Sequence, residues 1–211
     1  MSMIGHVRQI TPEQLKEMQG NPSLVVERLK SKGLPNLDEM VAALHRIQKI
    51  GLAGNGLISP DAFIDRERDR AQILAELQSV GVRLPGEDPG EEGLSLEKSW
   101  HTLHYLLTGK PEEAPPPLGN AILGGVPIGD DVGYGPARFL TPEQVREVAS
   151  ALSAFTMDDL ADRFDAGAMS AANVYGAEGE EPEWAQYYFA SLVRYYNDAA
   201  EKGNAMLLYI D

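Results

Sequence analysis

The sequence predicts an α+β fold in which a small mixed sheet of about three to four strands packs with about six or seven helices. Two observations predict it. Helical patterns outnumber strand patterns, and the two kinds follow one another without the regular alternation of a parallel-sheet protein or a repeat of fixed period. A length of 211 residues suits one core, so we expect one domain over residues 1–211.

Alternating polar and apolar residues and a helix-capping motif predict the first strand and the first helix. Residues 3–10 alternate loosely between polar and apolar side chains, which is typical of a strand. The motif TPEQ at residues 11–14 then supplies a threonine cap, a proline at the first helical position and a capping-box glutamine. Apolar residues at helical spacing predict two further helices, over 36–50 and 59–77.

Helical spacing also predicts a helix over residues 94–109, where Leu96, Trp100, Leu103 and Leu107 form one apolar stripe. Two connections flank it: a polar loop over 81–93 and a proline-rich segment over 109–118. We therefore expect this helix to pack its stripe into the core.

The C-terminal part repeats the earlier pattern of a strand followed by a TPEQ motif and a helix. A short strand ending at Leu140 leads into a second TPEQ motif at residues 141–144 and a helix, and Thr156 begins another helix with Asp159 in the third position. A long helix over 183–202 follows, ended by Gly203. The apolar run 205–210 predicts a strand that is covered on both faces.

Half of the eight tyrosines lie in this long helix. Its inward period contains Tyr188 and Tyr195, which predicts that they belong to the core. Tyr187 and Tyr196 fall outside that period. We expect these two to face outward, where tyrosines favour interfaces.

Two histidines on the helix over 94–109 are candidates for chemistry. His101 and His104 flank the apolar stripe on one side, and His104, at a half-buried edge beside Trp100, is the candidate acid or base. Their spacing of three residues differs from the usual helical zinc pair, and no third ligand is evident, so we predict no metal and no cofactor. The alternative is that both histidines bond to backbone groups.

The stretch GDDVGYGPAR is the second candidate region. It contains Asp130, Asp131, Tyr134 and Arg138, and it is read either as a turn or as one wall of a ligand pocket. An ion pair between Arg138 and one of the aspartates would make the loop rigid. The stretch lacks the motifs of a phosphate-binding loop or a dinucleotide site, and the chain has no serine nucleophile elbow.

The amino-acid composition restricts which classes of partner the protein can bind. Thirty-two acidic and eighteen basic residues give a net charge of −14, which disfavours nucleic acids and anionic membranes and permits a basic protein partner. The absence of cysteine excludes disulfides and thiol chemistry. With neither a leader pattern nor a membrane-length apolar run, we expect a cytoplasmic monomer or small homo-oligomer.

Four segments together resemble the YfbM-like family, a bacterial domain family of unknown function. They are MIGHVRQITPEQL, SLEKSWHTLHYLLTG, the segment from NAILGG to FLTPEQV, and the terminal AMLLYID. The resemblance implies a single α/β-type domain with its sheet beside helices, in a cytoplasmic bacterial protein. It implies no catalytic residues.

These observations favour an interaction or regulatory domain with an acidic surface over an enzyme, because few residues are available to form a reactive centre. The alternative is a small-ligand or enzymatic pocket between the WHTLH helix and the GDDVGYGPAR loop. Its candidate binding residues are Trp100, His101, His104, Asp130, Asp131, Tyr134 and Arg138.

Overall fold

The computed structural model describes residues 3–30, 93–179 and 181–211. They lie within one compact unit, which consists of Met1–Lys30 and Pro89–Asp211. A second unit, Ser31–Asp88, lies outside the described residues, as do both helices predicted between 36 and 77 and nearly all of the loop over 81–93. A single domain over the whole chain stays a prediction.

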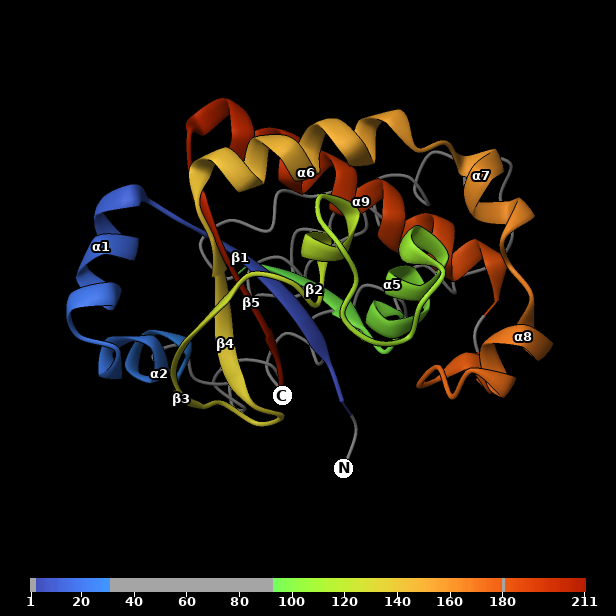
Figure 1. The fold of residues 1–211 in the computed structure, drawn as a ribbon, viewed down its shortest axis with the longest axis horizontal. Coiled ribbons are helices and arrows are strands. Elements are labelled where there is room, and N and C mark those ends of the chain that lie inside the picture. Colours follow the sequence, from blue (N-terminus) through green and yellow to red (C-terminus); the bar gives the residue numbers. More distant parts are fainter. Residues whose placement is uncertain (1–2, 31–92, 180) are drawn as a thin grey trace, which may run out of the picture. The chain divides into compact units, whose positions relative to one another are not determined.

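A five-stranded sheet lies at the centre of the unit (Figure 1). Its strand order is β2-β1-β5-β4-β3, and every neighbouring pair is antiparallel. The α+β class is confirmed, whereas the predicted strand count was too low and the sheet is antiparallel rather than mixed. The strands are β1 (Gly5–Ile10), β2 (Leu94–Glu97), β3 (Val126–Asp131), β4 (Pro136–Leu140) and β5 (Ala205–Ile210).

Helices cover both faces of this sheet (Figure 1). On one face α1 (Pro12–Gly20) and α2 (Ser23–Lys30) pack over a smaller core. The larger core, on the other face, is closed by five helices and two short 3-10 helices. These are α5 (Trp100–Thr108), α6 (Pro142–Ala154), α7 (Met157–Asp162), α8 (Ala166–Ala171), α9 (Pro182–Lys202), η2 (Leu118–Ala121) and η3 (Ala177–Gly179).

Strand β5 takes part in both cores because its side chains alternate between the two faces. Met206 and Leu208 belong to the larger core, whereas Ala205 and Leu207 belong to the smaller one. All four residues are buried. This confirms the prediction that the terminal strand is covered on both faces.

The predicted helix starts form as capping boxes. The Thr11 N–H donates to Gln14 Oε1 over 3.0 Å and the Gln14 N–H donates back to Thr11 Oγ1 over 3.2 Å. Thr141 and Gln144 form the same pair at the start of α6. These reciprocal bonds satisfy amide donors that a helix end leaves without partners, so each sheet-to-helix corner is defined locally.

The helix predicted over 94–109 is wrong at its start, because Leu94–Glu97 form strand β2. Leu96 has the right spacing for the helical stripe, but it is buried from an edge strand that pairs with β1. Glu97, at φ 47°, ends the strand before α5 begins. A second strand, β3, was missed because its Pro127 and Gly129 are typical of a loop.

The tyrosine prediction on α9 needs two corrections: Tyr188, expected in the core, is half-buried at its edge, and Tyr196 faces inward. It is fully buried, and its hydroxyl donates to the carbonyl of Ala121 over 2.9 Å. Burial raises the pKa of Tyr196 far above its usual range. Since α9 packs against α5, α6 and α7 as well as the sheet, its buried stripe is wider than a one-sided helix would have.

Candidate functional site

His101 on α5 has a backbone partner on each ring nitrogen. Its Nε2 lies 2.8 Å from the carbonyl oxygen of Pro111, and its Nδ1 lies 2.8 Å from the backbone nitrogen of Tyr175. A carbonyl only accepts and an amide only donates, so Nε2 carries the proton and Nδ1 accepts. The ring is therefore neutral, and it joins α5 to two other segments.

His104, one turn later, also contacts the proline-rich connection. Its Nε2–H donates to the Glu112 carbonyl over 2.8 Å. The side chain is fully buried, so the expected half-buried edge position is wrong. Its Nδ1 is buried and has no hydrogen-bond partner among the described residues. As an acceptor in the neutral ring, this nitrogen costs less to bury than a donor in the charged ring would.

Burial lowers the pKa of both histidines below the ordinary value, because a buried imidazolium loses its hydration. The carbonyl bonds of Pro111 and Glu112 oppose that effect. For His104, the neighbouring His101 lowers the pKa further. Both rings are thus set to remain neutral at pH 7. To act as an acid or base, His104 would first have to leave the Glu112 carbonyl.

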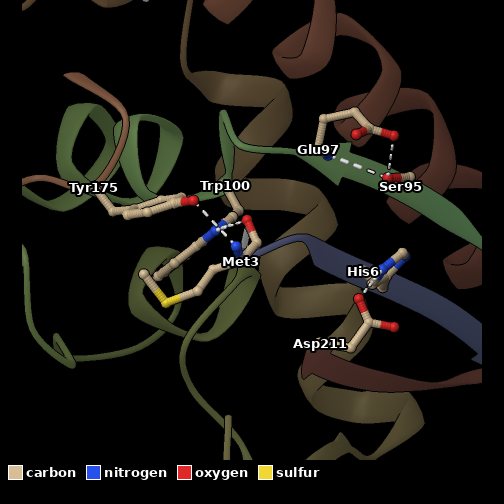
Figure 2. A network of polar contacts seen from close by, with 7 residues as sticks. All are labelled: Met3, His6, Ser95, Glu97, Trp100, Tyr175 and Asp211. Atoms are coloured by element: carbon tan, nitrogen blue, oxygen red, sulfur yellow. Dashed lines mark hydrogen bonds and ion pairs between the residues drawn. The ribbon is translucent and has the colours of Figure 1, made fainter. Parts of the chain in front are cut away.

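Trp100 is the centre of an aromatic cluster beside the histidines (Figure 2). It stacks on His101 with ring centroids 4.6 Å apart, and its indole N–H donates to the Met3 carbonyl over 3.3 Å. The Met3 amide donates to the Tyr175 hydroxyl over 3.1 Å. Gly5 lies so close to Trp100 that any larger residue at this position would clash with the Trp100 side chain. The indole bond and this close approach hold the start of the chain against α5, and the Tyr175 hydroxyl adds a second bond to Met3.

The GDDVGYGPAR stretch forms the β3–β4 hairpin. Asp131 holds its turn, because one carboxylate oxygen accepts from the Gly133 amide over 2.7 Å and from the Gly135 amide over 3.2 Å. Both glycines have positive φ, a conformation that side-chain-bearing residues rarely adopt. Asp130 is exposed beside them. These bonds are what a turn-forming aspartate provides.

Arg138 does not form the anticipated ion pair with Asp130 or Asp131. Its guanidinium pairs with the carboxylate of Glu113 and donates to the Gly125 carbonyl over 3.2 Å. Glu113 follows Glu112, the residue that His104 contacts. The two candidate segments are therefore linked through adjacent residues of the proline-rich connection.

A further polar pair lies near the hairpin, and the sequence reasoning missed it. The His6 Nε2 lies 3.0 Å from a carboxylate oxygen of Asp211 (Figure 2). The His6 ring also stacks on Tyr209, with centroids 4.7 Å apart. The amide of Tyr134, whose side chain is 47% exposed, donates to the Ile210 carbonyl over 3.1 Å. The alternation of GHVRQI could have indicated which face His6 takes, but its partner is 205 residues away.

The start of α9 and the segment before it are strongly acidic in sequence. Residues 156–183 contain eight acidic residues and one basic residue, Arg163. That arginine donates to the carbonyls of Leu106 and Leu107 and lies over the Phe155 ring, 4.8 Å from its centroid. Seven of the acidic residues are described and exposed: Asp158, Asp159, Asp162, Asp165, Glu178, Glu181 and Glu183.

An exposed aromatic group stands in the same region. Trp184, in the first turn of α9, is 55% exposed. It stacks on Tyr188 with centroids 6.5 Å apart, and Tyr187 meets Tyr188 edge-on at 5.1 Å. We call Trp184, the half-buried Tyr187 and Tyr188, and the exposed Glu181 and Glu183 of the same helix start the acidic–aromatic face.

In the described part of the chain, no group of three or more histidine, cysteine, aspartate or glutamate side chains is placed to hold a metal ion. Nor does any helix there have the length and apolar character needed to cross a membrane.

Comparisons with known proteins agree with the predicted resemblance. No curated protein matches the chain. Among solved structures, the crystal structure of YfbM from Escherichia coli, a protein of unknown function, matches with a TM-score of 0.53 and 18% identity, covering 99% of each chain. At that identity the likeness shows the fold alone. The model of the domain of unknown function DUF1877 matches residues 1–209, so this chain belongs to the DUF1877 family.

Proposed function

We propose that this protein is an interaction domain whose acidic surface binds a basic protein partner. The observation that carries the proposal is the eight-to-one excess of acidic residues in 156–183, whose only basic residue is engaged with carbonyls in the last turn of α5. A surface of one sign attracts partners of the opposite sign and repels nucleic acids and anionic lipids.

The bonds of the candidate residues also support binding over catalysis. His101 is bonded through both ring nitrogens, His104 through one, and Arg138 through its guanidinium. A pocket between the WHTLH helix and the hairpin would need at least His104 and Arg138 to exchange these internal partners for a ligand. The acidic surface needs no such rearrangement.

Affinity capture from an extract of the source organism tests the proposal. The immobilised protein should retain a basic protein that elutes when the salt concentration rises to about 0.5 M, because screening weakens contacts between exposed charges. A matched variant with Asp158, Asp162, Glu181 and Glu183 changed to Asn or Gln should retain much less of it. Capture of no basic protein, or retention that neither salt nor these changes reduce, would contradict the proposal.

A further inference from the structure

We propose that the acidic–aromatic face is the docking surface, and that its occupant is an arginine-rich segment of the partner protein. This inference rests on the proposed function and adds the place and the chemistry of recognition. Three observations carry it: an exposed indole in the first turn of α9, its stacking on a tyrosine of the next turn, and two exposed acidic residues that precede the indole in sequence.

Trp184 exposes an indole that has no folding role evident in its contacts. Tryptophan is among the side chains that gain most from burial, yet 55% of this one is exposed. Stacking on Tyr188, which contacts Tyr187 in turn, holds the indole in a defined orientation. A large aromatic surface held in one orientation is typical of the anchor residue of an interface.

The carboxylates determine which partner fits. Glu181 and Glu183 lie three residues and one residue before Trp184, and both are exposed. Acidic side chains near a helix start also stabilise the helix itself, which accounts for a residue such as Glu183 but not for the exposed indole. Carboxylates beside an aromatic ring provide both contacts that a guanidinium makes: a paired hydrogen bond and stacking on the ring.

A second copy of this chain does not fit the same surface. Two such faces would bring together carboxylates of like charge, and Arg163, the one basic residue of 156–183, is already engaged at α5 and Phe155. Lysine fits less well than arginine, because its ammonium cannot stack as a plane on the indole. An arginine-rich segment is therefore the occupant that satisfies both the rings and the charges.

Fluorescence anisotropy with a labelled nine-arginine peptide tests the surface in the full-length protein. We expect the peptide to bind, and Trp184→Ala to weaken the binding about two- to fivefold, as expected for the loss of an exposed cation–π contact. Tyr134→Ala is the matched control, because it removes another exposed aromatic ring from the β3–β4 turn, and it should leave the affinity unchanged. A nine-lysine peptide should bind more weakly than the arginine peptide.

Two results would overturn the inference, and both can be separated from failure of the proposed function. If Trp184→Ala and Tyr134→Ala bind the arginine peptide equally well, the acidic surface acts without this face. If the folded wild-type protein binds no arginine peptide, the face is not a docking surface for such a segment, and salt-sensitive capture then decides the proposed function independently. Thermal unfolding of each variant confirms that it is folded.

Discussion

The two tryptophans of this chain lie in contrasting surroundings. Trp100 is 5% exposed, stacks on His101 and donates to the Met3 carbonyl, whereas Trp184 is 55% exposed at the start of α9. Around the first, polar groups turn toward backbone partners inside the molecule. Around the second, an exposed indole stacks on the half-buried Tyr188, and the exposed Glu181 and Glu183 precede it in sequence. The residues around Trp100 thus serve the structure, and we propose that those at the start of α9 serve recognition.

The largest expected effect is on stability at the buried tryptophan. Trp100→Ala should lower the free energy of unfolding by about 3–5 kcal/mol, because it leaves a cavity in the larger core and frees the Met3 carbonyl. Denaturation by urea measures this loss. A decrease below about 1 kcal/mol would show that Trp100 does not hold the start of the chain against α5.

A smaller effect is expected at His101. Replacing it by leucine should lower the free energy of unfolding by about 1–3 kcal/mol, because the Tyr175 amide and the Pro111 carbonyl lose their partner. Unchanged stability of His101→Leu would show that the two bonds add nothing to folding.

The same histidines predict a dependence on pH. Because the folded-state pKa values of His101 and His104 are lowered, the unfolded chain binds more protons in the intervening range. The contribution of the two neutral histidines to the free energy of unfolding is present in full above the pKa that they have in the unfolded chain. It is lost as the pH falls toward their lower pKa values in the folded protein. The wild type should lose more stability than a His101→Leu, His104→Leu variant between pH 7.5 and 5.5, as measured by urea denaturation. An equal loss in both proteins would contradict this assignment.

Local signals predicted much of the fold. The TPEQ corners, the start of α7 at Thr156 and the end of α9 at Gly203 were predicted correctly, since capping depends on residues within one helical turn. Strand β2 was mistaken for a helix because Leu96 and Trp100 also satisfy helical spacing. Only pairing with β1, about 90 residues earlier in the chain, distinguishes the two structures.

The candidate site was predictable only in part, because side-chain partners come from distant segments. The alternative of backbone-bonded histidines matches the contacts of His101 and His104, but neither Pro111 nor Tyr175 could be identified as a partner from spacing. The pairing of His6 with Asp211 joins the two ends of the chain. Trp184 lies in no sequence motif that marks it as functional. Only its exposure in the folded unit distinguishes it from a core residue.

Loss of one hydrogen bond in the Trp100 cluster should have a modest effect. Tyr175→Phe removes the hydroxyl that accepts from the Met3 amide, and it should cost about 0.5–1.5 kcal/mol of stability. Tyr134→Phe is the control for removing a phenolic hydroxyl at an exposed site. Equal stabilities of these two variants would show that the Met3 bond contributes nothing measurable.

The smallest effect on folding is expected at the exposed tryptophan. Trp184→Ala should change the free energy of unfolding by no more than about 0.5 kcal/mol, because the side chain is more than half exposed and lies at the first turn of its helix. Urea denaturation alongside Trp100→Ala gives the comparison directly. A loss approaching that of Trp100→Ala would mean that Trp184 serves the fold instead of an interface.

The central claim is that the acidic–aromatic face binds a basic segment, and tryptophan fluorescence tests it most directly. Titration of the wild type with an unlabelled nine-arginine peptide at low salt should change the emission, because a guanidinium stacks on the Trp184 indole. In Trp184→Phe, where the buried Trp100 is the remaining indole, the same titration should leave the emission unchanged. An emission change that persists in Trp184→Phe, or no change in the wild type, would contradict the account.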